Sequence, residues 1–114
     1  MLHEMTLFPK PYASIASGQK TIELRLYDEK RQSIQIGDQI RFTNTQDASQ
    51  TTLCEVFQLH VFKNFAELYE SLPLLKCGYT PEDVVNAHPD DMLTYYSKEK
   101  QAQYGVVGIE LKRI

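Results

Sequence analysis

Residues 18–25 read Gly-Gln-Lys-Thr-Ile-Glu-Leu-Arg and contain the clearest structural pattern in the chain. From Thr21 onward apolar and polar residues alternate, which is typical of a half-buried β-strand. Gly18 lies just before this strand and tolerates the left-handed backbone that ends many helices. We therefore predict a helix that stops at Gly18 and a strand that begins at Thr21. The strand's apolar face comprises Ile22, Leu24 and Leu26, and its polar face comprises Thr21, Glu23, Arg25 and Tyr27.

The polar side chains of this stretch form a compact set that suits a polar ligand. Glu23 and Arg25 leave the same face of the strand, and Thr21 adds a hydroxyl to that row. Lys20 lies at the turn. A guanidinium can hold a phosphate or carboxylate bidentately, and a Lys or Glu in a dry pocket can be tuned toward base chemistry. The candidate ligand-binding residues are therefore Gly18, Thr21 and Arg25, and the candidate catalytic residues are Lys20 and Glu23.

A second interpretation of the same pattern assigns it no function. Thr21, Glu23 and Arg25 can be the solvated face of a half-exposed strand, with a surface ion pair that contributes about 0–1 kcal/mol. Periodicity alone favours this interpretation over a ligand site.

Three more cations and one tyrosine are further candidates for ligand binding. Lys30 and Arg31 end a charged run in an expected loop, and they reach a ligand if that loop folds over the pocket. Arg41 alternates outward on the neighbouring strand. Tyr104 stands at the mouth of the last strand, where an aromatic ring can stack on a base and contribute about 1–3 kcal/mol. The tyrosines at 95–96 have helical spacing, which is more typical of packing.

The order of the remaining elements predicts an α+β domain. Strands are expected at residues 4–8, 21–27, 40–43, 51–62 and 104–111. Helices are expected to begin near Pro11, Asn64, Thr80 and Pro89, the last one covering residues 89–101. Residues 28–33 and 44–50 are expected to be polar connections. Because closure protects sheet edges, we expect a small β-barrel of about five or six strands with flanking helices.

Composition favours one compact domain spanning residues 1–114. The chain is 114 residues long and 42% hydrophobic, enough for one core and too short for two ordinary domains. No apolar run approaches the roughly 18 residues that a membrane-spanning helix requires. The first residues also lack the basic flank and apolar run of a signal peptide. We therefore expect a cytoplasmic protein with no membrane partner.

Charge and motif content narrow the possible functions. Residues 1–50 carry six Lys/Arg and six Asp/Glu, whereas residues 51–114 carry six and nine, which accounts for the net charge of −3. Any attraction to nucleic acid is therefore local and confined to the first half. Neither Cys54 and Cys77 nor the three histidines have metal-ligand spacing, so we expect no metal and no cofactor. Motifs for a serine or cysteine nucleophile and for a phosphate-cradling loop are also missing.

Three segments carry a resemblance to a known family. They are Ile15 to Arg25 with its Gly-x-Lys-Thr-x-Glu-x-Arg pattern, Gly37-Asp38 before a strand, and the closing Tyr104-Gly-Val-Val. In this order and spacing the chain resembles, over nearly its whole length, the ASCH domain family of the PUA-like superfamily. The resemblance implies a small PUA-like β-barrel and a cleft that residues 18–25 line.

The resemblance also implies two kinds of activity. The cleft of the family has been proposed to bind RNA or a nucleotide-like ligand. One branch resembles small amidohydrolases that act on N4-acetylcytidine with a Lys, a Thr and a Glu, and other members have been described as ribonucleases. The lysine falls on Lys20, but the threonine's position holds Glu23. The distant glutamate would fall within residues 71–76, where no acid stands, and Glu70 and Glu82 are only approximate replacements.

Three hypotheses follow, and the first is a module that binds RNA or a modified nucleoside. Lys20 and Arg25 would grip a phosphate or carbonyl, while Glu23 accepts a hydrogen bond from a base or ribose hydroxyl. The second is a small hydrolase with Lys20 as base or nucleophile and Glu23 as proton shuttle. The third is a partner-docking protein that uses the acidic helices after Thr80. A Glu23–Arg25 pair with no cavity beside it would favour this third hypothesis.

Overall fold

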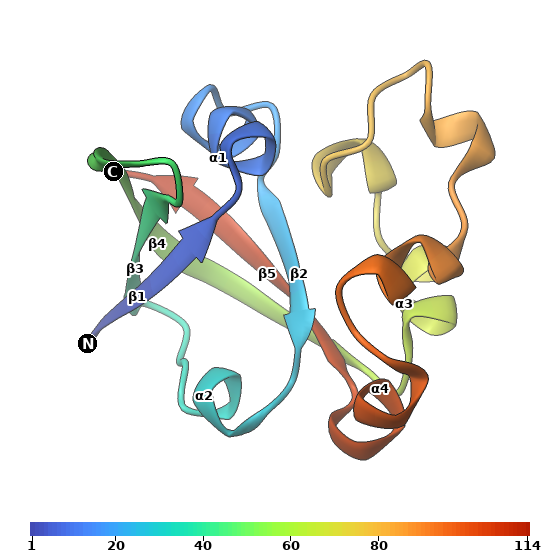
Figure 1. Cartoon of the computed structure of the whole chain (residues 1–114). Coiled ribbons are helices and arrows are strands. Elements are labelled where there is room, and N and C mark those ends of the chain that lie inside the picture. The colour runs from blue at the N-terminus through green and yellow to red at the C-terminus, as the bar shows by residue number, and fades with distance from the viewer.

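One five-stranded sheet organises the chain in the computed structural model, which describes residues 1–114 (Figure 1). The strands are β1 (Leu2–Leu7), β2 (Ile22–Leu26), β3 (Gln39–Asn44), β4 (Asp47–Phe62) and β5 (Val106–Arg113). Their order in the sheet is β1-β3-β4-β5-β2. β1 pairs with β3 in parallel, and all other neighbours are antiparallel. β1 and β2 are therefore the two edge strands.

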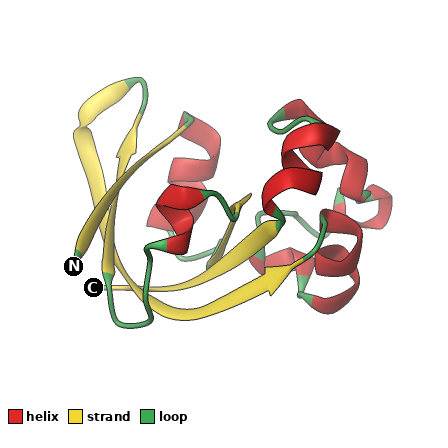
Figure 2. Cartoon of the chain, turned by 90° about the horizontal axis from the view of Figure 1, so that it is seen from below, coloured by secondary structure: helices red, strands yellow, loops and turns green.

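The sheet curls into a half-barrel because its long strands bend. β4 shifts register against β5 between Val56 and Gln58, and such an irregularity bends a strand and increases its twist. Figure 2 shows the long strands curving along the lower side of the molecule. The curl brings β2 close enough to β1 for Arg25 to reach the carbonyl oxygen of Thr6, although the two strands do not pair. We call this unpaired junction between β1 and β2 the seam.

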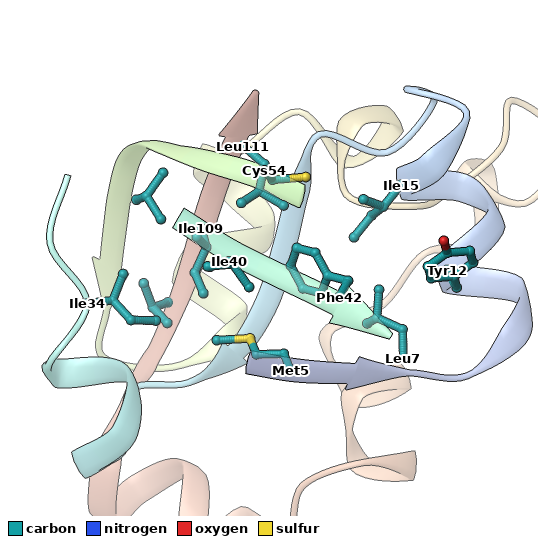
Figure 3. Packing of buried hydrophobic residues seen from close by; sticks show 12 residues of the cluster. Met5, Leu7, Tyr12, Ile15, Ile34, Ile40, Phe42, Cys54, Ile109 and Leu111 are labelled. Carbon is teal, nitrogen blue, oxygen red and sulfur yellow. The ribbon is translucent and has the colours of Figure 1, made fainter. Parts of the chain in front are cut away.

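Two apolar clusters pack against the sheet. Twelve buried residues, with Phe42 and Ile40 fully enclosed, fill the half-barrel (Figure 3). The second cluster, of eight buried residues, includes Phe65 and Leu68 of α3 (Phe65–Ser71). The three apolar side chains of β2 belong to this second cluster. Because side chains alternate along a strand, the polar side chains of β2 point to the half-barrel side.

Short helices flank the half-barrel. α1 (Pro9–Ala16) leads from β1 toward β2, and α2 (Glu29–Gln32) follows β2. Between α3 and α4 (Lys98–Tyr104) the chain forms three 3-10 helices beside the sheet (Figure 1). These are η1 (Leu74–Lys76), η2 (Val84–Asn86) and η3 (Pro89–Thr94). No helix combines the length and the apolar character needed to cross a membrane.

The predicted α+β class is confirmed, and five strands form the curled sheet. The helix stop at Gly18 is also observed, since α1 ends at Ala16 and Gly18 has a φ of 85°. Asn64 caps α3 as predicted, accepting a hydrogen bond from the amide of Glu67.

The prediction of a loop over residues 44–50 is wrong. The chain reverses at residues 45–46, and β4 already begins at Asp47. Asn44 supports this tight turn, because its side chain accepts from the amide of Gln46 and donates to Gln50. Side-chain hydrogen bonds of this kind stabilise turns that a polar composition alone does not reveal.

The single helix expected over residues 89–101 is also wrong. η3 ends at Thr94, and α4 begins at Lys98 after an interruption. Ser97 accepts a hydrogen bond from the amide of Lys100 and so starts a new helix inside the expected one. The apolar periodicity of the sequence continues across this break, so the pattern did not predict the interruption.

Two shorter segments also differ from expectation. One contains a helix that was not predicted, and the other lacks the helix that was predicted. The polar connection over residues 28–33 contains α2, whose N-terminus Asp28 caps. Thr80 and Asp83 exchange the reciprocal hydrogen bonds expected of a helix start, yet only a turn and η2 follow. The capping pattern of Thr80 and Asp83 therefore indicates a turn here, and no α-helix follows it.

The substitution Gly108→Ala tests how Leu72, the residue directly after α3, packs on the sheet. An added Cβ would lie 2.6 Å from Leu72 Cδ1 and 3.2 Å from Ile22 Cγ2. We expect Gly108→Ala to lower the free energy of unfolding by about 1–3 kcal/mol, as overpacking does. The same change in a Leu72→Ala background should cost less, because the nearest atom is gone. Chemical denaturation of the four proteins measures this coupling, and equal costs in both backgrounds would contradict the packing described.

Candidate functional site

A cleft of about 520 Å³ lies beside the seam. Its sheet-side wall comes from the end of β1, the first turns of α1, and β2 with the turn before it. The opposite wall comes from α3, residues 77–83 and η3 with the residues that follow it. Sites for small ligands in proteins have volumes of roughly 300–1,000 Å³, so the cleft is large enough for a nucleotide.

Glu23 is the buried centre of the sheet-side wall, with only 4% of its surface exposed. Its Oε1 lies 2.9 Å from Lys20 Nζ, and its Oε2 accepts a 2.7 Å hydrogen bond from Arg25 Nε. Glu23 and Arg25 point to the same side because they alternate with the apolar residues of β2. Lys20, from the turn before the strand, reaches the carboxylate from the other side. We call Lys20, Glu23 and Arg25 the charged triad.

The charges of the triad stabilise one another. Burial alone would raise the pKa of Glu23, but Lys20 and Arg25 outweigh it through their charges and hydrogen bonds, and the pKa is lowered. Burial opposes the charge of Arg25 as well, yet Glu23 raises the pKa of that guanidinium above its ordinary value. Glu23 is therefore a carboxylate at neutral pH. With two cations against one anion, the triad presents a net positive charge to the cleft.

Side chains also bridge the seam. The Nη2 of Arg25 donates to the carbonyl of Thr6 at 2.9 Å, and Lys30 Nζ donates to the carbonyl of Glu4 at 3.0 Å. Both acceptors belong to β1, which pairs only with β3. Two cations therefore satisfy edge carbonyls that a closed barrel would satisfy with another strand.

The helical wall of the cleft carries a chain of hydrogen bonds. Tyr79 donates its hydroxyl proton to Asp91 Oδ2 at 2.7 Å, and the hydroxyls of Tyr69 and Tyr79 lie 2.6 Å apart. Because a phenol has one proton, Tyr69 must be the donor to Tyr79. Burial raises the pKa of both tyrosines, so both are neutral phenols. Nearby, Tyr95 is 57% exposed at the cleft wall.

The loop that packs over Lys20 restricts its position. Gly78 has a φ of 110°, and a Cβ there would lie 3.3 Å from Lys20 Cδ. Cys77 beside it is buried, which raises the pKa of its thiol to about 11, so the thiol is protonated and a poor nucleophile. No group of three or more His, Cys, Asp or Glu side chains is arranged to hold a metal ion.

The same fold and sequence pattern occur in known proteins. A family model described as the ASCH domain matches residues 5–114. The chain belongs to the ASCH domain family. Its curled half-barrel with flanking helices is consistent with the PUA-like fold of that family.

Solved structures of similar proteins agree with this assignment. Hypothetical protein PH0355, known from a crystal structure, is 32% identical in sequence to this chain. The match covers all of both chains and has a TM-score of 0.80. Protein PF0455 from Pyrococcus furiosus is 31% identical over 100% of this chain and 98% of its own, with a TM-score of 0.71. ASCH from Zymomonas mobilis covers 97% of this chain and 66% of its own with a TM-score of 0.67; at 12% identity it shows the fold alone. No curated protein matches the sequence.

The ASCH domain brings only some of the predicted site residues together. Lys20, Glu23 and Arg25 meet in the cleft. Gly18 and Thr21 instead line a second, smaller hollow.

The other candidates are occupied elsewhere. Lys30 bridges the seam, and Arg31 lies 3.4 Å from Asp28 with its Nε buried and without a partner. Arg41 lies 3.6 Å from Glu4 on the surface. Tyr104 packs against the second apolar cluster.

Sequence reasoning missed most of the helical wall. Tyr69, Tyr79 and Asp91 come from three segments that no periodic pattern connects. The tyrosines at 95–96 were expected to pack, and both line the cleft, with Tyr96 also stacked on Phe65 at 6.3 Å. Tyr69 has the helical spacing of a packing residue, so nothing in the sequence indicated that its hydroxyl contacts Tyr79.

The substitution Glu23→Gln tests the triad. It removes the anion and leaves two cations together, so we expect a loss of about 3–5 kcal/mol in the free energy of unfolding. The control Glu110→Gln disrupts a half-exposed pair with His60, 2.8 Å long, and should cost about 1 kcal/mol or less.

The pH dependence of this loss gives a second readout. The folded-state pKa of Glu23 is lowered, so its stabilisation is complete above the unfolded-state pKa of about 4.3 and disappears as pH falls through the folded-state value. The gap between wild type and Glu23→Gln should therefore narrow below about pH 4. Urea denaturation from pH 7 to pH 3 measures it, and a gap independent of pH would contradict the ion pairing.

Proposed function

We propose that this ASCH domain binds RNA or a nucleoside or nucleotide-like ligand in the cleft beside the seam. The observation that carries the proposal is the buried Glu23 carboxylate between Lys20 and Arg25 on the cleft wall. A charged group costs much to bury, and here it orients two cations toward a cavity. The family likeness supports a ligand of the nucleic-acid type.

The triad has donors left for a ligand. Arg25 uses Nε for Glu23 and Nη2 for Thr6, which leaves further N–H groups of its guanidinium for a phosphate or carbonyl. Lys20 has three donors and contacts one carboxylate oxygen. Glu23 remains an acceptor for a base amine or a ribose hydroxyl. An aromatic contact is offered by Tyr95, whose exposed ring can stack on a base.

The cleft itself bears on the partner-docking hypothesis. That hypothesis was tied to a Glu23–Arg25 pair with no cavity beside it. The pair is present, but it lines a cleft of about 520 Å³, which favours ligand binding.

Ligand titration tests the proposal. We expect nucleosides, nucleotides or short single-stranded RNA to shift the amide resonances of residues 18–31 and 77–96 in NMR spectra. Lys20→Ala should weaken binding about tenfold or more, because a hydrogen bond to a charged group contributes about 1.5–3 kcal/mol. Tyr95→Ala should weaken it about fivefold or more through lost stacking.

The matched control for the aromatic change is Phe57→Ala. Phe57 is 61% exposed, similar to Tyr95, and lies outside the cleft. It should leave binding unchanged. Shifts confined to residues outside the cleft, or equal losses in Tyr95→Ala and Phe57→Ala, would refute the proposed site.

A second candidate function is hydrolysis, because Lys20 and Glu23 lie 2.9 Å apart and both face the cleft. In this mechanism water cleaves the amide of N4-acetylcytidine, giving cytidine and acetate, or cleaves RNA. Lys20 and Arg25 lower the pKa of Glu23, so this carboxylate does not readily take up a proton near neutral pH and is a poor proton shuttle. The binding function is therefore preferred.

Turnover assays separate the two functions. If the domain is a hydrolase, incubation with N4-acetylcytidine or single-stranded RNA should give product, and Lys20→Ala should abolish it while Lys98→Ala, on exposed α4, should not. If it only binds, neither the wild type nor the variants should form product. Equal turnover by wild type and Lys20→Ala would remove Lys20 from the mechanism.

A further inference from the structure

A second hollow of about 260 Å³ adjoins the cleft. Lys20 lines both cavities and is the one residue that they share. The hollow lies where the turn after α1 meets the last residues of β5, and Gly18 and Thr21 contribute to it. A ligand that extends past Lys20 would therefore enter this hollow.

The charge of the hollow differs from that of the cleft. Its three ionised side chains are all cationic, namely Lys20, Lys112 and Arg113, and no Asp or Glu lines it. In the cleft, three cations face three carboxylates, so their charges balance. Arg113 lies opposite Cys54 in the β4–β5 ladder and shares its side of the sheet, whereas Lys112 lies opposite Glu55 and leaves the other side. The hollow is thus the more favourable of the two for a phosphate.

Arg113 is held in place at the edge of the hollow. Its Nη1 donates to the carbonyl of Ala16 at the end of α1, and a Cβ on Gly18 would lie 3.3 Å from its Nη2. The glycine, whose φ is 85°, therefore lets the guanidinium lie close to the backbone. An arginine that is already positioned loses less conformational entropy on binding an anion.

The floor of the hollow is apolar. Ile15, Cys54 and Leu111 are buried and line it beneath the cationic rim. Burial raises the pKa of the Cys54 thiol to about 11, so the floor carries no anion that would repel a phosphate. An apolar floor with a cationic rim suits a sugar with its attached phosphate.

From this geometry we infer that the hollow is a phosphate subsite for single-stranded RNA. The inference rests on the proposed function, since the neighbouring nucleotide occupies the cleft. The strand passes over Lys20, and its next phosphate binds Arg113 at the edge of the hollow. The natural ligand is then an RNA strand of two or more nucleotides, and a free nucleoside fills only part of the site.

The test compares a mononucleotide with a ribo-tetranucleotide. The wild type should bind the tetranucleotide more tightly, with an affinity that depends more steeply on salt. The substitution Arg113→Ala should reduce the slope of log affinity against log salt by about 0.7, the value for one lost contact. Mononucleotide affinity should be unchanged, because Arg113 does not line the cleft.

A matched control removes the same charge elsewhere. Lys98→Ala alters an exposed lysine of α4 that lines neither cavity, and it should leave the slope unchanged. Lys112→Ala removes the neighbouring charge on the other side of β5 and keeps the Arg113 contact with α1, so it should change the slope less than Arg113→Ala does.

Two outcomes would show which of the two proposals fails. Equal affinity for both ligands, or an unchanged slope in Arg113→Ala, would overturn the subsite and leave the cleft proposal intact. Failure of the wild type to bind either ligand would overturn both.

Discussion

The carboxylate of Glu23, buried between Lys20 and Arg25, is the interaction on which the rest of the site depends. An isolated carboxylate at 4% exposure would be strongly disfavoured, and it is tolerated because both of its oxygens contact cations. The same contacts hold the two cations at the cleft, where long side chains would otherwise be mobile. The entropic cost of ordering these two side chains therefore arises during folding and not when a ligand binds.

Arg25 links this site to the architecture of the domain. Its guanidinium contacts Glu23 and the carbonyl of Thr6, so one side chain belongs to the binding surface and to the bridge across the seam. A closed barrel would have paired β1 with β2, whereas here both are edge strands. The half-barrel instead leaves this edge to cationic side chains, and a polar site arises at the place where the backbone pairing is incomplete.

The elements that sequence could predict are those that local patterns determine. Alternation predicted β2 and the shared face of Glu23 and Arg25, Gly18 marked the end of α1, and Asn64 marked the start of α3. The burial of Glu23 was not predictable, because a paired glutamate and a solvated one have the same spacing. The tyrosine wall was also hidden, since packing between distant segments brings Tyr69 to Tyr79.

The central claim is that Glu23 is a buried carboxylate stabilised by its two cations. The most direct test is an NMR titration of the side-chain carboxyl carbon of Glu23, assigned by comparison with Glu23→Gln. The account predicts a pKa below the ordinary value of a glutamate. A pKa above that value would mean that burial outweighs the two cations, and it would contradict the charged triad.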